Sequence, residues 1–362
     1  MILHRPIKIR VAFTKHFYFI LYTCCLLLYS GGCATTGSQI SFFQTDADSA
    51  KLVWPPPPQT ARIKYIGTIA APSESGEQKS WFSSLLFGKE EPIEVMLRPY
   101  GVFAASNRVY VTDPGLSIIH IFDLDEKKYF SVDKAKDEDL VSPIGIAVDS
   151  NGDIYISDSV LKRIITFNRE GKYIKETASP EMFIRPAGIA LDEDRIYIVD
   201  THAHKVFVLS KKDGKSLFEF GRNGTGDCEF NYPTNIFIGK DGSLYITDSL
   251  NFRIQIFDKN GNFISSFGKH GDSLGDFSKP KGVAVDSEGH IYVADAHFDN
   301  VQIFNKDGRL LLTFGNTGRR NGEFTLPAGI FIDKNDRIYV TDSYNNRIQI
   351  FQYLKETKSI NN

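Results

Sequence analysis

Hydrophobic residues along most of this chain come in short runs that are separated by turn-forming residues. In one stretch, residues 233–238, 243–248, 253–258 and 263–268 are rich in Ile, Phe and Tyr, and Asp241-Gly and Asn260-Gly lie between runs. β-Branched and aromatic residues favour strands. Asp-Gly and Asn-Gly supply the positive φ angles of tight hairpin turns. The pattern predicts a unit of four short antiparallel strands.

This unit recurs six times. Each copy contains Tyr-hydrophobic-X-Asp, and each aspartate follows a proline by 14 or 15 residues. The aspartates are Asp113, Asp158, Asp200, Asp248, Asp295 and Asp342. A repeat of this length indicates an array of one supersecondary unit. Radial stacking of four-stranded sheets buries their faces and leaves only short edges, so we predict an all-β, six-bladed β-propeller.

The sixth unit contains only three strand-like runs, at residues 328–333, 337–342 and 347–351. Residues 61–70, near the other end of the chain, carry the pattern of a fourth strand. We expect this segment to close the last blade, so that the propeller spans residues 61–356 and residues 357–362 form a tail. Within 81–97, Trp81, Leu85 and Leu86 have helical spacing and suggest a short helix.

The repeat unit combines Phe-Gly-X-X-Gly, Phe-X-X-Pro-X-Gly, Ile-Tyr-Val-X-Asp and Asn-X-Arg-Ile-Gln-Ile-Phe, and it resembles the NHL repeat family. The resemblance covers about residues 98–352, and 267–304 and 314–351 match the pattern best. It implies a propeller that binds partners. Individual copies depart from the pattern: Asn235 replaces a glycine, Cys228 replaces another, and Ile118 stands where other units have arginine.

The first 32 residues have a different character. They contain four basic and no acidic residues, followed by an apolar stretch at 17–29 that is shorter than the ~20 residues of a spanning helix. This is the pattern of a secretory signal. Cys33 directly follows Gly31-Gly32, which resembles a bacterial lipoprotein signal and implies that Cys33 carries lipid. The alternative is an uncleaved N-terminal anchor. Residues 33–60, with Trp54 before four prolines, would be a tether.

The lipoprotein resemblance implies an exported protein attached to the bacterial cell envelope, at the outer membrane or the periplasmic face. Charge limits its partners further. The chain has 42 basic and 44 acidic residues, and loss of the four N-terminal basic residues would leave 38 against 44. A mildly acidic protein of this kind disfavours nucleic-acid binding, so we expect a membrane, through the anchor, and an envelope protein or glycan as partners.

Residues that break the repeat are the best candidates for a binding surface. In a propeller, the loops between the second and third strands share a face with the connections between blades, and such loops commonly carry function. Histidine and aromatic residues gather in these loops on units three to six. They form our candidate binding face: His202, His204, Phe252, His297, Phe298 and Tyr344. The alternative is that they are unrelated loop residues that cap the blades.

The repeated aspartates are expected to be structural. In four units, a basic residue lies five positions after the aspartate: Arg163, Lys205, Arg253 and Arg347. This spacing suits local hydrogen bonding and charge pairing.

A metal enzyme is the alternative class. His202 and His297 occupy equivalent positions two units apart, and imidazoles are common metal ligands. The segment 295–301 is similar to repeats of the peptidylglycine amidating lyases, whose zinc histidines occupy the Pro-X-Gly slot. Here that slot holds Tyr100, Ile144, Ala187, Thr234, Lys281 and Ala328. We therefore assign no catalytic residue, cofactor or metal site and favour a binding scaffold; a metal-dependent lyase or hydrolase acting in the central channel is the alternative.

Overall fold

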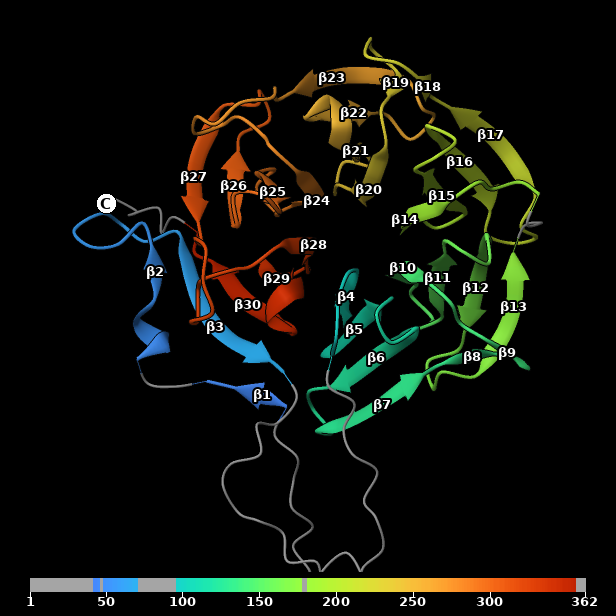
Figure 1. Cartoon of the computed structure of the whole chain (residues 1–362), viewed down its shortest axis with the longest axis horizontal. Helices are drawn as coiled ribbons and strands as arrows, with labels where there is room; N and C mark the ends of the chain where they lie inside the picture. Colours follow the sequence, from blue (N-terminus) through green and yellow to red (C-terminus); the bar gives the residue numbers. More distant parts are fainter. Residues whose placement is uncertain (1–41, 46–47, 71–95, 178–180, 356–362) are drawn as a thin grey trace, which may run out of the picture. The chain divides into compact units, whose positions relative to one another are not determined.

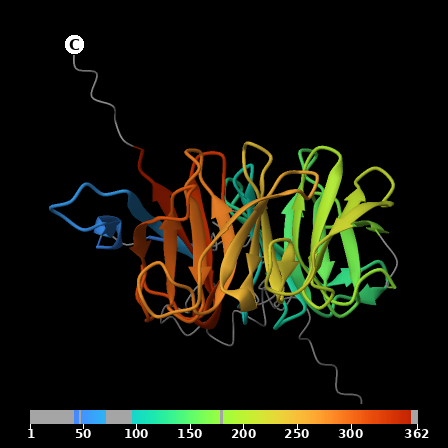
Figure 2. The same ribbon diagram turned by 90° about the horizontal axis from the view of Figure 1, so that it is seen from above.

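Six antiparallel sheets are arranged around a central axis, and the first strand of each lies closest to that axis (Figure 1). The computed structural model describes residues 42–45, 48–70, 96–177 and 181–355. Seen from the side, the strands run between the two faces of a flattened ring (Figure 2). The predicted all-β, six-bladed propeller is confirmed.

Five blades are continuous in sequence, and their strands pair in chain order. Blade 1 contains β4 (Val102–Ala105), β5 (Arg108–Asp113), β6 (Ile118–Asp123) and β7 (Lys128–Val132). Blade 2 contains β10 (Pro143–Val148), β11 (Ile154–Asp158), β12 (Arg163–Phe167) and β13 (Tyr173–Thr177). Blade 3 contains β14 (Pro186–Leu191), β15 (Arg195–Asp200), β16 (Lys205–Ser210) and β17 (Ser216–Phe220). Blade 4 contains β20 (Pro233–Ile238), β21 (Leu244–Asp248), β22 (Arg253–Phe257) and β23 (Phe263–Phe267). Blade 5 contains β24 (Pro280–Val285), β25 (Ile291–Asp295), β26 (Asn300–Phe304) and β27 (Leu310–Phe314).

Blade 6 is assembled from both ends of the sequence. It contains β28 (Pro327–Ile332), β29 (Arg337–Asp342) and β30 (Arg347–Tyr353), and β3 (Ile63–Ile69) pairs with β30 as its outer strand. Ile63 and Tyr65 of β3 are fully buried against blade 6. The predicted closure of the last blade by an N-terminal strand is confirmed.

Residues 42–45 and 48–59, which we call the N-terminal strap, differ from the expected tether. The strands β1 (Phe43–Gln44) and β2 (Val53–Trp54) both pair with β3. The Trp54 ring lies 5.9 Å from the Phe314 ring and 5.8 Å from the Phe351 ring. A tryptophan buries a large apolar area, which favours packing over a solvated spacer. The expected signal segment, Cys33 and residues 33–41 lie outside the described residues.

Most of the segment expected to form a short helix, 81–95, also lies outside the described residues, and Met96 and Leu97 are not helical. In the described ranges, no helix is long and apolar enough to cross a membrane. The remaining elements are short: η1 (Ser49–Lys51), β8 (Lys134–Ala135), β9 (Glu138–Asp139), β18 (Arg222–Asn223), β19 (Glu229–Phe230), η2 (Ser249–Asn251) and η3 (Ser343–Asn345).

Hydrophobic clusters fill the spaces between neighbouring blades. One cluster joins Ile121 of blade 1 to Ile156 of blade 2, and another joins Tyr292 of blade 5 to Ile338 of blade 6. The alternating pattern of the sequence produces this packing, since each sheet presents apolar side chains to both neighbours.

Hydroxyl groups join the blades around the inner circumference. Thr112 of blade 1 donates to the Ile144 carbonyl of blade 2 at 2.7 Å, and Thr341 of blade 6 donates to the Tyr100 carbonyl of blade 1 at 3.0 Å. Ser157, Thr201 and Ser249 make similar bonds at other junctions. Blade 5 has alanine, Ala294 and Ala296, at the two equivalent positions. The Thr341 bond shows that the junction between blades 6 and 1 is bonded in the same way as the junction between blades 1 and 2.

Candidate functional site

The repeated aspartates hold the loops of one propeller face. This face, which we call the loop face, carries the turns between second and third strands and the connections between blades. In blade 2, Asp158 accepts backbone hydrogen bonds from Val141 and Ser142 of the connection and from Val160 and Leu161 of the turn. The predicted structural role of the aspartates agrees with these contacts, which fix both loops relative to the rigid sheet.

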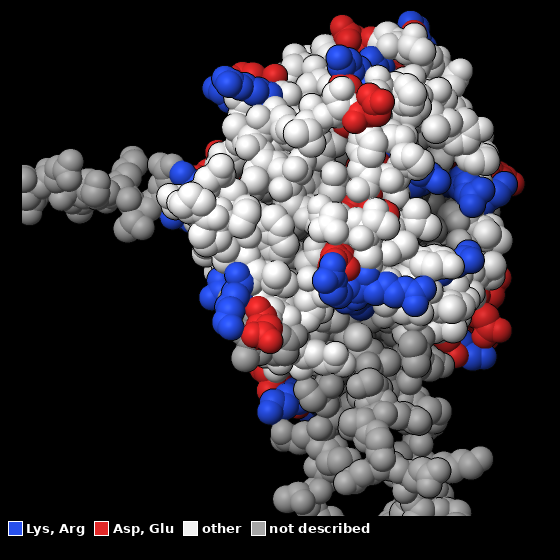
Figure 3. Space-filling model, turned by 60° about the vertical axis from the view of Figure 1, so that its left-hand side comes forward, with Lys and Arg blue, Asp and Glu red and all other residues white. Residues whose placement is uncertain are grey.

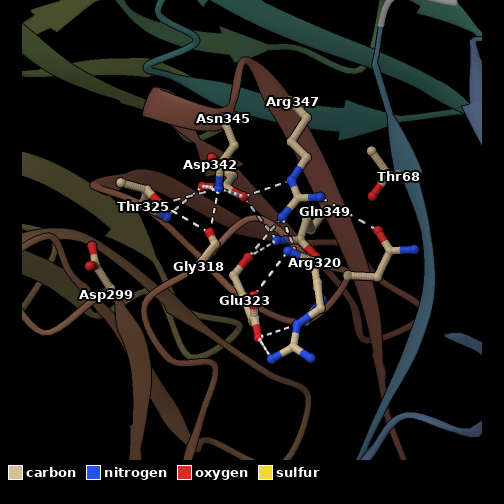
Figure 4. A network of polar contacts seen from close by, with 12 residues as sticks. Thr68, Asp299, Gly318, Arg320, Glu323, Thr325, Asp342, Asn345, Arg347 and Gln349 are labelled. Carbon is tan, nitrogen blue, oxygen red and sulfur yellow. Dashed lines mark hydrogen bonds and ion pairs between the residues drawn. The ribbon is translucent and has the colours of Figure 1, made fainter. Parts of the chain in front are cut away.

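In blade 6, the aspartate is the centre of a larger network (Figure 4). Its carboxylate accepts hydrogen bonds from Thr325 N at 2.8 Å, Asn345 Nδ2 at 2.9 Å, Arg347 Nε at 2.7 Å and Gln349 Nε2 at 3.0 Å. Burial raises the pKa of Asp342, and the charge of Arg347 opposes this effect. We call the Asp342, Arg347 and Gln349 side chains the clamp of blade 6.

The clamp also holds the connection that leads into blade 6. Arg347 and Gln349 donate to the Glu323 carbonyl at 2.9 and 2.6 Å, and Gly322 N donates to Gln349 Oε1 at 2.8 Å. This explains why aspartate, arginine and glutamine recur together in the repeat: they form one unit that bonds a long, glycine-rich loop to its sheet.

Only part of the ring carries the clamp. Blade 4 repeats it with Asp248, Arg253 and Gln255, and blade 5 keeps Gln302 but has Asn300 in place of arginine. The predicted pairing of basic residues with the aspartates holds for Arg253 and Arg347. It is wrong for Arg163, which pairs with Glu138 and Glu176, and for Lys205, which pairs with Glu219.

The candidate residues form separate groups on the loop face. His202 and His204 of blade 3 both contact Tyr232, with ring centroids 5.3 and 5.0 Å apart. Tyr232 N also donates to His204 Nδ1 at 3.2 Å. Tyr232 lies in the connection leading into blade 4 and was not among the predicted residues. Its position directly before Pro233 was the available signal, because that position ends the connection at the loop face.

The other candidates lie in their own loops. Phe252 packs on His270 with ring centroids 4.4 Å apart, and His297 contacts Phe298 at 6.1 Å. Tyr344 is 64% exposed. Among the described residues, no group of three or more His, Cys, Asp or Glu is arranged to hold a metal ion. The structure thus brings His202 and His204 together around Tyr232 and leaves His297 in the loop of a different blade.

Exposed apolar side chains extend the candidate face around all but one of the blades. They lie at two kinds of position: just before the proline of the first strand, and two or three residues after the repeated aspartate. We call them the apolar ring: Leu97, Leu116, Val141, Val160, Ile184, Tyr232, Leu250, Leu326 and Tyr344. Sequence reasoning missed the aliphatic members because an apolar loop residue next to a strand-like run is read as the first or last residue of that strand. Their recurrence one or two residues before the proline, or two or three after the aspartate, was the signal.

The central channel contains a cavity of about 350 Å³. The first strands of all six blades line it. Phe103 and Phe331 form part of its wall, with ring centroids 4.2 Å apart, and Phe237 lies 6.0 Å from Phe331. At the loop-face end, the Pro-X-Gly positions place Tyr100 and Lys281 in the lining.

Comparison with known proteins supports the repeat and the fold. The NHL repeat family matches residues 277–304 and 324–351, and a family described as 6-bladed beta-propeller matches residues 176–244. The chain is 30% identical to human NHL repeat-containing protein 3 over 168 residues, which are 44% of this chain and 39% of that protein. It is 29% identical over 102 residues to a probable peptidyl-alpha-hydroxyglycine alpha-amidating lyase of Caenorhabditis elegans, covering 27% of this chain and 29% of the lyase.

Among solved structures, an auxiliary nutrient binding protein from Bacteroides thetaiotaomicron superposes with a TM-score of 0.57 at 16% identity. The match covers 72% of this chain and 70% of that one, and at this identity it concerns the fold alone. The sequence matches cover well under two thirds of the curated relatives. Together with the geometry, these findings establish that the chain is a six-bladed β-propeller that contains NHL repeats.

Proposed function

We propose that this protein is a non-catalytic binding scaffold whose loop face engages a protein partner in the bacterial cell envelope. The observation that carries the proposal is the apolar ring, because nine large apolar side chains are exposed on one face of a rigid fold. Exposed apolar side chains gathered on one face mark interaction sites, and aromatic anchors such as Tyr344 and Tyr232 are enriched in them.

A protein partner suits the composition of the ring better than a glycan. Leu97, Val141 and Ile184 are aliphatic, and they offer apolar area without hydrogen-bonding groups. A glycan would depend on the aromatic and histidine side chains of blades 3–6 alone. On the side of the molecule in Figure 3, charges of both signs are interspersed, which fits a neutral partner rather than a polyanion.

The proposed location rests on the sequence. A basic segment, a short apolar core and Cys33 favour export and lipid attachment, at the outer membrane or the periplasmic face. Several acyl chains would hold the protein stably at a membrane. Labelling with a radioactive fatty acid tests this: incorporation that disappears in Cys33→Ser supports the anchor, and equal labelling of the variant contradicts it.

The binding face is tested by photo-crosslinking in intact cells, followed by binding measurements with the purified partner. A crosslinker at Tyr344 or Leu250 is expected to capture a defined partner, whereas one at Leu311, exposed on the outer strand β27, is not. Replacing Leu250, Leu326 and Tyr344 of the apolar ring, together with His202, His297 and Phe298, with alanine should abolish binding without changing thermal unfolding. Undiminished binding by the folded variant would place the face elsewhere.

A further inference from the structure

Besides the loop face, the molecule has a second surface suited to a ligand, the wall of the central cavity. Most of this wall is apolar, and Ile144, Ala187 and Ala328 occupy three of the six Pro-X-Gly positions at the loop-face end. The remaining three hold Thr234, Lys281 and Tyr100. Because the polar positions belong to blades 4, 5 and 1, they lie on one side of the ring with Ala328 among them.

Lys281 is the charged lining residue at this end of the cavity. Within the described ranges, no carboxylate forms an ion pair with it, and burial alone lowers its pKa. The hydroxyl of Thr234 donates to the backbone carbonyl of Lys281 at 2.9 Å and so does not supply a proton to a ligand. A cation removed from water without a partner is costly, and an anion from solution would compensate it.

Tyr100 adds a second donor to the same lining. Burial raises the pKa of its phenol, while the nearby charge of Arg185 opposes that rise. The hydroxyl therefore stays protonated at neutral pH and is able to donate a hydrogen bond. Lys281 as a cation and Tyr100 as a neutral donor, both in the lining, make the loop-face end of the channel favourable for negative charge.

The opposite end of the cavity has different electrostatics. Asp286 and Asp333 line it, and their carboxylates already accept hydrogen bonds from Tyr292 at 3.0 Å and Tyr339 at 3.3 Å. Lys240 and Lys334 also line this end, and both are exposed to solvent, which screens their charge. An anion would thus be drawn to Lys281 and not to the far end, and the aromatic wall of Phe103, Phe237 and Phe331 would lie below it.

We propose that the channel binds a small carboxylic acid with an apolar or aromatic body, whose carboxylate pairs with Lys281 while its body packs against the channel phenylalanines. A mostly apolar pocket with a few convergent polar groups is the usual form of a small-molecule site. The cavity volume suits a compound of one aromatic ring with a short acid side chain. This site is independent of the macromolecular partner proposed for the loop face.

The test uses the full chain in a non-ionic detergent, phenylacetate as the probe, and its uncharged analogue phenylacetamide. Isothermal titration is expected to give a Kd of about 1 mM or tighter for phenylacetate. Phenylacetamide, and phenylacetate with the Lys281→Met variant, should bind at least about tenfold more weakly, because each lacks one charge of the pair.

Two further variants make the result specific. Lys240→Met, which removes a lining lysine at the far end, should leave phenylacetate binding unchanged. Tyr100→Phe should weaken it by a smaller factor than Lys281→Met. Equal affinity for acid and amide would mean that the cavity binds apolar rings only, and undiminished binding by folded Lys281→Met, or no binding by the native chain, would overturn the proposal. The melting temperature of Lys281→Met serves as the folding control.

Discussion

The two halves of the ring hold their loops in different ways. In blades 4 and 6, a buried aspartate, arginine and glutamine bond the incoming connection to the sheet, and each connection also inserts a fully buried phenylalanine, Phe230 or Phe324. In blades 1–3, the aspartate bonds backbone groups without this clamp, and the basic residues of blades 2 and 3 pair at the surface. The connections are thus held through an arginine and glutamine in blades 4 and 6, and through backbone groups that bond the aspartate in blades 1–3, with His120 as an added partner in blade 1.

This difference overlaps only in part with the blades in which the repeat is recognised. The matched NHL repeats lie in blades 5 and 6, and the arginine and glutamine positions of blade 1 hold Ile118 and His120. The long glycine-rich connections occur in the half that has the clamps. What blades 4–6 share is the glutamine, Gln255, Gln302 or Gln349, which donates to a backbone carbonyl of the connection. The repeat signature therefore reflects this glutamine and its glycine-rich connection more than the complete clamp.

The largest effect is expected from removing the N-terminal strand. A chain that begins after residue 75 lacks β3 and the strap, so blade 6 loses its outer strand and the clamp of blade 6 loses its cover. Thermal unfolding should become broad and shift to lower temperature. As the matched control, a chain that lacks only residues 1–39 should keep one sharp transition. A sharp, unchanged transition in the shorter chain would show that the clamps suffice.

The clamp itself is tested by one pair of substitutions. Arg347→Met leaves Asp342 buried without its guanidinium partner and should cost about 3–5 kcal/mol in unfolding free energy. Arg163→Met removes ion pairs to glutamates that are one third to one half exposed, and it should cost about 0–1 kcal/mol. Urea denaturation of both variants measures the difference. Equal losses would remove the proposed distinction between the two halves.

Acid should affect the contributions of Asp113 in blade 1 and Asp342 in blade 6 in opposite directions. Burial acts to raise the pKa of Asp113, but hydrogen bonds from His120 and from the Leu97 and Arg98 amides outweigh it and hold the pKa below its usual value. That carboxylate stabilises the fold above the unfolded pKa, near 4, and the contribution is lost as pH falls through the folded pKa. Burial instead raises the pKa of Asp342 in the folded protein. The stability that this carboxyl group contributes is therefore fully present below the pKa of the unfolded chain, and it is lost as pH rises through the pKa of the folded protein.

Asp113→Asn and Asp342→Asn separate these contributions. The stability difference between the native protein and Asp113→Asn should shrink as pH falls from 6 toward 3. For Asp342→Asn the same difference should grow. Urea unfolding at several pH values in this range measures both, and parallel pH profiles for the two variants would contradict the assignment.

The smallest predicted effect concerns Cys228 in the connection to blade 4. Its φ is +61°, and the equivalent residues leading to blades 5 and 6 are Gly275 and Gly322 with φ of +91° and +80°. A side chain in this region is strained, so Cys228→Gly should raise the unfolding free energy by up to about 1 kcal/mol. A clear loss of stability would show that the partial burial of the thiol outweighs the backbone strain.

Much of the fold could be predicted because it follows from local patterns. The six repeats and the strand of residues 61–70 each carry hydrophobic spacing and turn residues that specify a strand within a few positions. The strap was harder, since the apolar contacts of Trp54 are made with residues more than 250 positions away. Four prolines beside it gave a stronger local signal for an extended spacer.

The candidate site was predictable only in part. Histidines at 202 and 204 stood out by residue type, but Tyr232, which lies between them and blade 4, is identified only by contact. Lys281 and Tyr100 were visible as occupants of the Pro-X-Gly slot. Their significance depends on a cavity formed by six strands, which no single repeat encodes.

The hydroxyl bonds around the inner circumference have one further consequence. Thr341 and Ser343 join blade 6 to blade 1 as Thr112 joins blade 1 to blade 2, and Leu354 N donates to the Arg62 carbonyl at 2.7 Å where β30 and β3 meet. A short peptide linking these two strands would turn them into an ordinary hairpin. The point at which the chain starts can therefore be moved without changing which strands pair. A circularly permuted chain with new ends between β3 and β4 would have six blades that are each continuous in sequence.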